Sequence, residues 1–302
     1  MAKNFFNRYV WLIDQIYRHG HITREELNRA WRHSSLNENK EEEIPERTFY
    51  NHKTAIEETF GLEIKCDRSL GYYIENADEV NGDDLTKWML NLLSVRNLVS
   101  ESVSVRDRII TEDVPSGNVW LSEISRAMTE SSVLSMTYQS FYRPEPHTVE
   151  IEPWCLKLFR QRWYLYGYSL NYSNTRIYAL DRIISLKVLN KKFQLPEDFS
   201  ASAVFDDIMG VSVSAKEHTK AQKIRVKVSA GQSKYFRTLP LHHSQQEVEH
   251  QEDYSVFEYW LVPTFEFRQE LLSQGSAVEV LEPASFRSEM ANEAAAMLAR
   301  YQ

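Results

Sequence analysis

Cysteine is scarce in this sequence, and its placement excludes several kinds of protein. The two cysteines, Cys66 and Cys155, lie far apart, and neither belongs to a CxxC pair. This excludes a cysteine-rich structural zinc site and a disulfide-stapled secreted fold, and a chain of 302 residues can bury its cores without either. We expect a protein of a reducing, cytoplasmic compartment that needs no metal and no cofactor.

Long apolar runs and catalytic motifs are also absent. No stretch approaches the length of a membrane-spanning helix, and the first twenty residues lack the apolar centre and cleavage site of a signal peptide. His242, His243 and His250 form no HExxH or HxH pattern, and there is no glycine-rich phosphate loop and no GxSxG. The adjacent carboxylates Asp206 and Asp207 fall in a connecting segment, where side chains are solvated. These absences favour a protein that is not an enzyme.

Acidic residues exceed basic ones, and the net charge is −8. The excess is unevenly distributed: residues 1–80 carry −4, residues 81–134 carry −3, residues 135–195 carry +5 and residues 196–302 carry −6. A basic segment between acidic flanks creates a local positive field, which favours an anionic ligand or partner at that segment.

Residues 1–80 follow the order helix, helix, helix, hairpin, which is the order of a winged helix-turn-helix DNA-binding domain. Thr23 and Glu26 form a capping-box pattern that predicts the start of the second helix. The third helix is expected between Pro45, which a first turn tolerates, and Gly61, which ends it.

The third helix and the hairpin offer groups that suit DNA. Cations suit phosphates, whereas amides and hydroxyls near the start of a recognition helix suit base edges. We predict base contacts from Arg47, Thr48 and Asn51, phosphate contacts from Tyr50 and Lys53, and backbone or minor-groove contacts from Lys65 and Arg68. The alternative is a small helical domain whose charged face is only solvated, and the net charge of −4 leaves it open.

The remaining sequence predicts four further parts of an α+β, multidomain protein. Residues 81–131 have a helical pattern and would form a linker or dimerisation segment. Residues 132–195 are rich in β-branched and aromatic residues in period-2 alternation, which indicates a strongly bent sheet or a small barrel. Residues 196–221 form a connector with a short helix, and residues 222–302 alternate strands and helices as an α+β domain.

The basic charge is concentrated in "RQRWYLYGYSLNYSNTRIYALDRI", residues 160–183, which holds four arginines, six aromatic residues and one acidic residue. The stretch is typical of a two-stranded hairpin, in which alternate side chains share a face. Trp163 and Leu165 would face the core. We expect the polar faces of both strands to lie on the same side, contributing Arg160, Arg162, Tyr164, Tyr166, Tyr168, Arg176, Tyr178 and Arg182.

Such a face suits a nucleotide or oligonucleotide. Guanidinium groups bind phosphate through two parallel hydrogen bonds, and tyrosine rings stack on bases. An ordinary half-exposed hairpin would also have a polar outer face, so this second interpretation stays open.

The same residues resemble the core motif of the WYL-domain transcriptional regulators. Trp163-Tyr164-Leu165 is the triplet that names the domain, and Asp181-Arg182-Ile183 matches the Asp-Arg-Ile that closes its next strand. "LSMTYQS" and "EIEPWCLKLFRQRWYL" are similar to the preceding strands, "IPERTFYNHKTAIEETFGLEIKCDRSLGYYI" to the family's winged helix, and "LSQGSAVEVLEPASFRSEM" to its C-terminal extension. The acidic "NENKEEE" is an insert where a helix-turn-helix usually has a short turn.

This resemblance implies a homodimeric, DNA-binding regulator whose WYL domain has a Sm-like β-barrel fold and senses a ligand, often proposed to be a nucleic acid or nucleotide. Carried over by position, the pocket comprises Tyr138, Tyr164, Arg176 and Arg182 with Tyr178 nearby, and the face pattern adds Arg162. Two functions stay open. One is a ligand-responsive regulator, expected to repress DNA-damage or phage-defence genes from a palindromic operator. The other is an accessory protein that binds nucleic acid without sequence preference and modulates a defence or repair enzyme.

Overall fold

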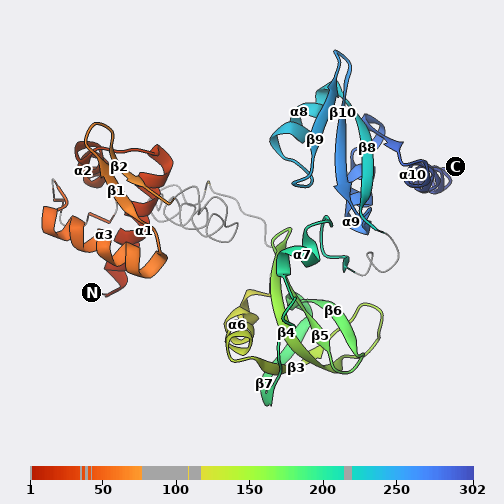
Figure 1. Ribbon diagram of the computed structural model, residues 1–302, viewed down its shortest axis with the longest axis horizontal. Coiled ribbons are helices and arrows are strands. Elements are labelled where there is room, and N and C mark those ends of the chain that lie inside the picture. Colours follow the sequence, from red (N-terminus) through yellow and green to blue (C-terminus); the bar gives the residue numbers. More distant parts are fainter. Residues whose placement is uncertain are drawn as a thin grey trace. The chain divides into compact units, whose positions relative to one another are not determined.

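The computed structural model describes residues 2–34, 36–37, 40–41, 43–76, 108, 117–213 and 220–302. The chain divides into two compact units, Met1–Glu112 and Asp113–Gln302. Figure 1 shows their elements coloured along the chain. Most of the predicted helical segment 81–131 lies outside the described residues.

The N-terminal unit contains three helices followed by an antiparallel hairpin, in the predicted order (Figure 1). Its elements are α1 (Ala2–His19), α2 (Arg24–His33), α3 (Glu46–Phe60), β1 (Ile64–Asp67) and β2 (Gly71–Ile74). The predicted capping box starts α2, because the Glu26 N–H donates to the Thr23 hydroxyl oxygen at 3.3 Å and the Thr23 N–H donates to the Glu26 carboxylate at 2.8 Å. Gly61, at φ 66°, ends α3 in the left-handed conformation that glycine adopts without strain.

One apolar core holds this unit together. Each helix contributes a buried aromatic side chain, namely Trp11, Trp31 and Phe49, and the rings of Trp11 and Trp31 meet edge to face at 5.4 Å. The acidic insert after α2 is anchored to the helix, since the Asn37 side chain donates to the carbonyl oxygens of Trp31 at 3.3 Å and Glu41 at 2.8 Å. Asn37 and Glu41, two described residues of the insert, are therefore linked to each other and to the end of α2.

The second unit begins with a five-stranded antiparallel sheet covered by a helix. Its elements are η2 (Asn118–Trp120), α6 (Leu121–Thr129), β3 (Ser132–Tyr138), β4 (His147–Phe159), β5 (Arg162–Ser169), β6 (Asn174–Ala179), η3 (Leu180–Arg182) and β7 (Ile183–Lys192). The strand order is β6-β5-β4-β3-β7, so β6 and β7 form the two edges. The sheet is open, and the predicted closed barrel is wrong. The physical reason is that β6 and β7, which η3 joins directly, pair with β5 and β3 and not with each other, so no hydrogen-bonded strand pair closes the sheet.

The register of β5 and β6 corrects the prediction of one shared polar face. Leu165 lies opposite Tyr178, and Tyr164 lies opposite Ala179. Directly opposed residues share a face, so the tyrosine and arginine of β6 lie on the face of Leu165, while the tyrosines of β5 lie on the other face. The turn over 170–173 has four residues and sets this pairing. A turn one residue longer or shorter would have brought the two polar faces together.

The tyrosine face of β5 is covered by the connector that follows β7. This connector contains α7 (Ala201–Phe205), and the rings of Phe199 and Phe205 lie 6.4 Å and 5.8 Å from that of Tyr166. Phe199 also contacts Trp154 of β4 at 5.3 Å. Only 8% of Tyr166 is exposed, so this part of β5 is buried on both faces. The prediction that this side of β5 is presented to solvent is wrong at Tyr166.

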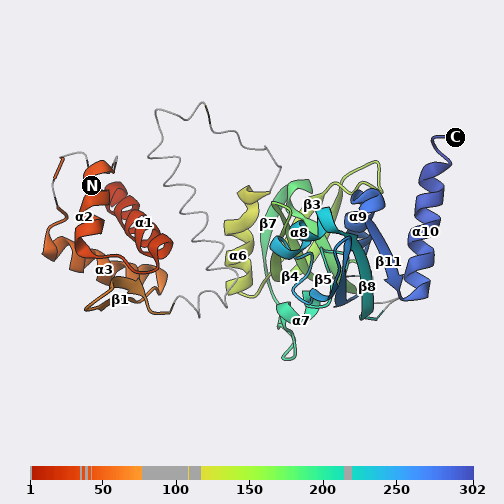
Figure 2. The same ribbon diagram turned by 90° about the horizontal axis from the view of Figure 1, so that it is seen from above.

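The last part of the second unit alternates strands and helices, as predicted. Its elements are β8 (Gln222–Ser229), α8 (Ala230–Thr238), β9 (Gln246–His250), β10 (Tyr254–Leu261), α9 (Phe265–Ser273), η5 (Gly275–Ala277), β11 (Val278–Glu282) and α10 (Ala284–Leu298). The strand order is β11-β8-β10-β9, and Figure 2 shows α10 on the β11 side of the sheet. The sequence does not predict β9, because "QEVEH" is a charged edge strand with a single apolar residue.

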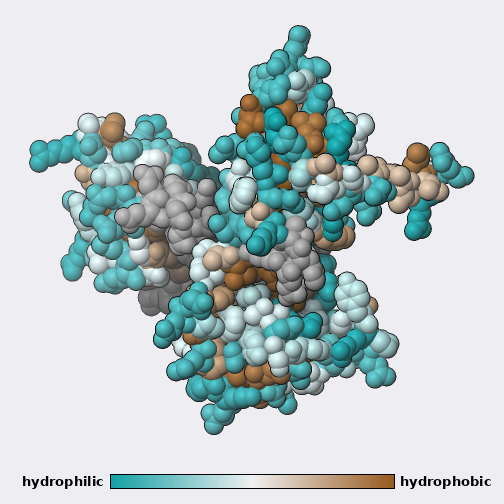
Figure 3. Space-filling model, turned by 45° about the vertical axis from the view of Figure 1, so that its right-hand side comes forward, coloured by the Kyte–Doolittle hydropathy of each residue, from teal (hydrophilic) through white to brown (hydrophobic). Residues whose placement is uncertain are grey.

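The helices of this part pack on one face of its sheet, and their shared core includes Phe236 of α8, Phe267 of α9 and Phe286 of α10. On the face shown in Figure 3 most residues are hydrophilic, and apolar residues gather in smaller groups. No helix among the described residues is long and apolar enough to span a bilayer.

Candidate ligand and nucleic-acid sites

The five arginines of residues 135–195 fall into two groups, and two of them are ion-paired. Arg160 pairs with Glu270 of α9. The Nη1 atom of Arg162 lies 3.9 Å from the Oδ2 atom of Asp181. Carboxylates of the chain therefore already engage these two cations.

The other three, Arg143, Arg176 and Arg182, form what we call the arginine cluster. The Cζ atom of Arg182 lies 3.7 Å from the centroid of the Phe141 ring, and that of Arg176 lies 4.1 Å from the centroid of Tyr172. Arg143 approaches the same tyrosine at 5.9 Å. Among the described residues, none of the three has a carboxylate oxygen within 4.0 Å. Stacking on a ring leaves the N–H edge of a guanidinium available to an anion.

Hydrogen bonds of backbone and side-chain groups position this cluster. The loop between β3 and β4 is held against η3, because the Gln139 N–H donates to the Arg182 carbonyl oxygen at 3.1 Å. The Gln139 side chain donates to the Arg143 carbonyl oxygen at 2.9 Å. On β6, the Nε of Arg176 donates to the Asn174 side-chain oxygen at 3.0 Å. The arginines thus come from three different segments that are tied into one sheet.

Two buried tyrosines lie next to the arginine cluster. Tyr138 of β3 and Tyr178 of β6 are 6% and 5% exposed, and their rings meet edge to face at 5.0 Å. Burial raises the pKa of both phenols, and nearby groups offset part of the rise, Arg182 at Tyr138 and Ser169 and Arg176 at Tyr178. Both phenols therefore stay protonated and can donate hydrogen bonds. The Nε of Arg182 is also buried and has no hydrogen-bond partner in the described part of the chain.

The structure brings together four of the six predicted ligand residues, namely Tyr138, Arg176, Tyr178 and Arg182. Tyr164 lies on the face of the sheet opposite to that of Arg176 and Tyr178. Arg182 of η3 is still near enough to offset part of the rise that burial causes in the pKa of Tyr164. The Arg162 guanidinium faces Asp181.

The structure adds three residues that sequence reasoning missed, Phe141, Arg143 and Tyr172. The sequence features that could have identified them are the aromatic pair before an arginine in "FYRP", which contains Phe141 and Arg143, and Tyr172 inside the turn of the basic stretch. Both lie in loops, where strand periodicity carries no information.

In the N-terminal unit, α3 presents one continuous exposed stripe. The stripe comprises Arg47, Tyr50, Asn51 and Thr54, which are three and four positions apart. The buried side of the helix comprises Phe49, His52 and Ile56. Thr48 and Lys53 are half-buried at the sides of the stripe. Three of the predicted DNA contacts therefore share an exposed face, on which only the Tyr50 ring is seen to contact the unit's core, meeting Phe49 edge to face at 5.9 Å among the described residues.

The two predicted cations of the hairpin differ in their surroundings. The Nζ of Lys65 lies 3.0 Å from a carboxylate oxygen of Glu63 and 3.3 Å from one of Glu75, and the hydrogen bond to Glu63 raises the pKa of Lys65. Arg68 lies in the exposed turn between β1 and β2. Arg68 is therefore better placed than Lys65 to reach a DNA backbone.

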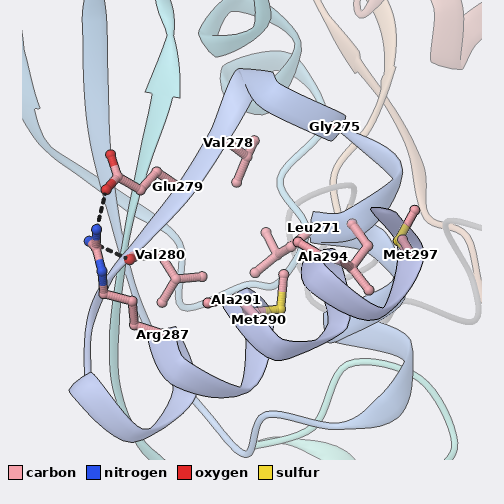
Figure 4. Close-up of a pocket in the computed structure, with 11 residues that line it drawn as sticks. Leu271, Gly275, Val278, Glu279, Val280, Arg287, Met290, Ala291, Ala294 and Met297 are labelled. Carbon is pink, nitrogen blue, oxygen red and sulfur yellow. Dashed lines mark hydrogen bonds and ion pairs between the residues drawn. The ribbon is translucent and has the colours of Figure 1, made fainter. Parts of the chain in front are cut away.

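A separate pocket of about 320 Å³ lies between α9, β11 and α10 (Figure 4). Apolar side chains line most of it, including Leu271, Val278, Val280, Met290 and Met297. Its two charged residues, Arg287 and Glu279, pair with each other at 2.6 Å. An anion would meet no unpaired cation in this pocket, so the arginine cluster suits an anionic ligand better.

The candidate nucleophiles and metal ligands form no comparable site. Burial raises the pKa of the Cys155 thiol to about 11, which keeps it protonated and unreactive. Asp206 and His243 approach each other at 3.5 Å with both side chains mostly exposed. In the described ranges, no three histidine, cysteine, aspartate or glutamate side chains are grouped as metal ligands would be.

Comparison with known proteins identifies two domains in the chain. The sequence matches the model of the WYL domain at residues 119–188 and that of the WCX domain at residues 220–298. No curated protein matches the chain.

Two solved structures are similar to the chain at low identity. Proteasome accessory factor B/C (PafBC) of Arthrobacter aurescens is 18% identical, with a TM-score of 0.33 over 94% of this chain and 46% of that one. A CRISPR Cas-related protein is 13% identical, with a TM-score of 0.37 over 99% of this chain and 85% of that one. The chain therefore spans less than half the length of PafBC. A WYL domain followed by a WCX domain is the combination typical of WYL-domain regulators, and this chain contains both domains in that order.

Proposed function

We propose that this protein is a ligand-responsive, DNA-binding transcriptional regulator. In this proposal the N-terminal unit binds operator DNA and the WYL domain binds an anionic effector at the arginine cluster. The observation that carries the proposal is the state of the five arginines of the basic segment. Two have carboxylate partners, whereas Arg143, Arg176 and Arg182 have none among the described residues and lie over aromatic rings.

The chemistry of the arginine cluster favours a nucleotide or a short single-stranded oligonucleotide. Three unpaired guanidinium groups supply the N–H pairs that bind phosphate oxygens. The rings of Phe141 and Tyr142 are 73% and 97% exposed and lie in the loop that carries Arg143, so bases can stack there. A simple inorganic anion would use the cations and leave the rings without a role.

The N-terminal unit supports DNA binding through the stripe on α3. A helix preceded by two helices and followed by a hairpin can place its exposed face in a major groove, with the hairpin beside it as a wing. Arg47 and Asn51 lie on that face with a cation and an amide suited to phosphate and base edges. We therefore assign this unit as a winged helix-turn-helix.

A response to the effector requires two arrangements of the DNA-binding units. The effector shifts the equilibrium only if it binds one arrangement more tightly than the other. We propose a homodimer that represses its target genes from a palindromic operator. The two equivalent DNA-binding units of such a dimer would match the two half-sites of the palindrome. DNA-damage or phage-defence genes are the proposed targets.

The effector site is tested by exchanging single arginines for glutamine. Binding of a fluorescently labelled single-stranded oligodeoxynucleotide of about ten nucleotides is measured by anisotropy. Each of Arg176→Gln and Arg182→Gln is expected to weaken binding at least tenfold, because a charge-assisted hydrogen bond contributes about 1.5–3 kcal/mol. Arg162→Gln is the matched control and should change binding less than threefold, since Asp181 already engages that cation. Equal losses in all three variants, or none, would overturn the assignment.

The DNA-binding unit is tested by footprinting on promoter DNA near the gene. The parent protein should protect a palindrome, with affinity falling steeply as salt rises. Arg47→Ala combined with Asn51→Ala should abolish the protection, while Lys234→Ala, an exposed cation of α8, should leave it unchanged. Uniform, salt-sensitive binding without a footprint would support the accessory-protein function instead. Robust Mg²⁺-dependent turnover of an oligonucleotide would contradict a purely regulatory role.

A further inference from the structure

A small cavity lies in the N-terminal unit, between its three helices. Its volume is about 10 Å³, and its lining comprises Arg8, Trp11, Leu12, Trp31, Ile44 and His52. These side chains come from α1, α2, the segment before α3, and α3 itself. The cavity therefore lies where the third helix packs against the other two.

Three polar nitrogen atoms of this lining are buried and have no hydrogen-bond partner among the described residues. They are the Nε of Arg8, the Nε1 of Trp31 and the Nε2 of His52. Trp31 and His52 are 1% and 4% exposed, so solvent outside the fold does not reach them. Buried polar groups in folded proteins are nearly always hydrogen-bonded, to protein or to an internal water molecule. Three such groups around one cavity point to a shared partner.

We propose that one internal water molecule binds in this cavity and bridges Arg8, Trp31 and His52. A cavity of about one probe sphere, roughly 10–15 Å³, is what a single water molecule needs, together with two to four polar partners. The donors and acceptors also match. The N–H groups of Arg8 and Trp31 donate to the water oxygen, and the water donates to the lone pair of His52 Nε2.

The chemistry selects water over an anion. Two N–H donors alone could hold a small anion, but the lone pair of a neutral imidazole would repel it. His52 is neutral here, because burial and the Arg8 cation lower its pKa to about 4. A neutral His52 that accepts at Nε2 carries its proton on Nδ1. The proposal therefore also specifies the tautomer.

The water site gives His52 a positioning role. His52 lies on the buried side of α3, and its neighbour Asn51 lies on the exposed stripe. A bridge from His52 to α1 and α2 fixes the rotation of α3 about its axis, and with it the direction in which the stripe points. The site itself does not depend on the proposed DNA binding.

The test is NMR spectroscopy of the full-length, ¹⁵N-labelled protein at pH 7. The indole N–H of Trp31, assigned with Trp31→Phe, should show a cross-peak to water in a ROESY spectrum with the sign of dipolar contact rather than of chemical exchange. The indole of Trp260, which is 59% exposed, is the control and should show only exchange. Absence of the dipolar cross-peak at Trp31 in the folded protein would overturn the proposal.

A second measurement is independent of that assignment. Long-range ¹H–¹⁵N correlation of the imidazole should show the Nδ1–H tautomer of His52. The Nε2–H tautomer would place three donors around the cavity and would also overturn the proposal. His52→Phe, which removes the acceptor and keeps an aromatic ring against Tyr9, should abolish the dipolar cross-peak at Trp31.

Discussion

Acidification should destabilise the N-terminal unit through His52. The group is 4% exposed, and burial, followed by the Arg8 cation, lowers its pKa from 6.5 to about 4 in the folded chain. The unfolded chain therefore binds a proton at His52 more readily than the folded chain does. Stability is fully present above the unfolded pKa of about 6.5, falls as the pH drops from there to about 4, and changes no further below that for this group.

The size of the effect follows from the shift. A difference of about 2.5 pKa units at about 1.36 kcal/mol per unit corresponds to about 3 kcal/mol between neutral pH and pH 4. At pH 5 the loss from His52 is about 2 kcal/mol, because the folded chain is then still mostly unprotonated at this site. A loss of this size is a large fraction of the stability of a small domain.

Hydrogen exchange followed by mass spectrometry measures this loss within the full-length protein. Peptides from α1, α2 and α3 report the opening free energy at several pH values between 7 and 4.5, after correction for intrinsic exchange rates. Carboxylates also titrate in this window, so the useful quantity is the difference between the parent and His52→Phe. Exposed His33 of α2 provides the control, and His33→Gln should keep the parent's pH dependence. If His52→Phe retains the same slope as the parent, the assignment of the effect to His52 is refuted.

Three further predictions concern stability. Gly167→Ala should unfold or strongly destabilise the second unit in a thermal melt, because the added Cβ would lie 2.0 Å from the Glu152 carbonyl oxygen. A near-normal melting temperature would show that β4 and β5 can separate at this point. Thr23→Ala should lower the opening free energy of α2, measured by hydrogen exchange, by about 1 kcal/mol, because the capping box loses its hydroxyl acceptor. No change would mean that Glu26 alone caps the helix. Leu165→Ala should cost about 2–5 kcal/mol in urea unfolding of the second unit, because this fully buried side chain leaves a cavity, and a loss below about 1 kcal/mol would indicate that the core collapses around it.

The prediction from sequence succeeded where the signal is local. The capping box of Thr23 and the glycine at position 61 mark helix ends through bonds and torsion angles within a few residues, so they can be read from the chain. The predicted strands also occur, because period-2 alternation reflects a sheet with two different faces. The edge strand β9 was missed because it lacks that alternation.

The candidate effector site was predicted only in part. Its tyrosines and arginines were identified by type and by resemblance, and Tyr138, Arg176, Tyr178 and Arg182 do lie together. The error over Tyr164 has a single cause, since one residue in the length of a turn decides which faces of two strands coincide. Whether the turn between two strands has an odd or an even number of residues in the paired register cannot be seen in the pattern of either strand alone.

The amino-acid sequence by itself determined most of the helices and strands, the concentration of positive charge in one segment and the resemblance to WYL-domain regulators, because each depends on residue type and local spacing. Only the tertiary structure decided which arginines of that segment remain without an ion-pair partner. Arg160 is engaged by Glu270, 110 positions away, while Arg176 and Arg182 meet aromatic rings of turns and loops. The tertiary structure also covered Tyr166 with the connector that follows β7. Contacts between distant segments depend on how the whole chain packs. These contacts select the arginines that form the candidate site, whereas the charge pattern identifies only the segment in which they lie.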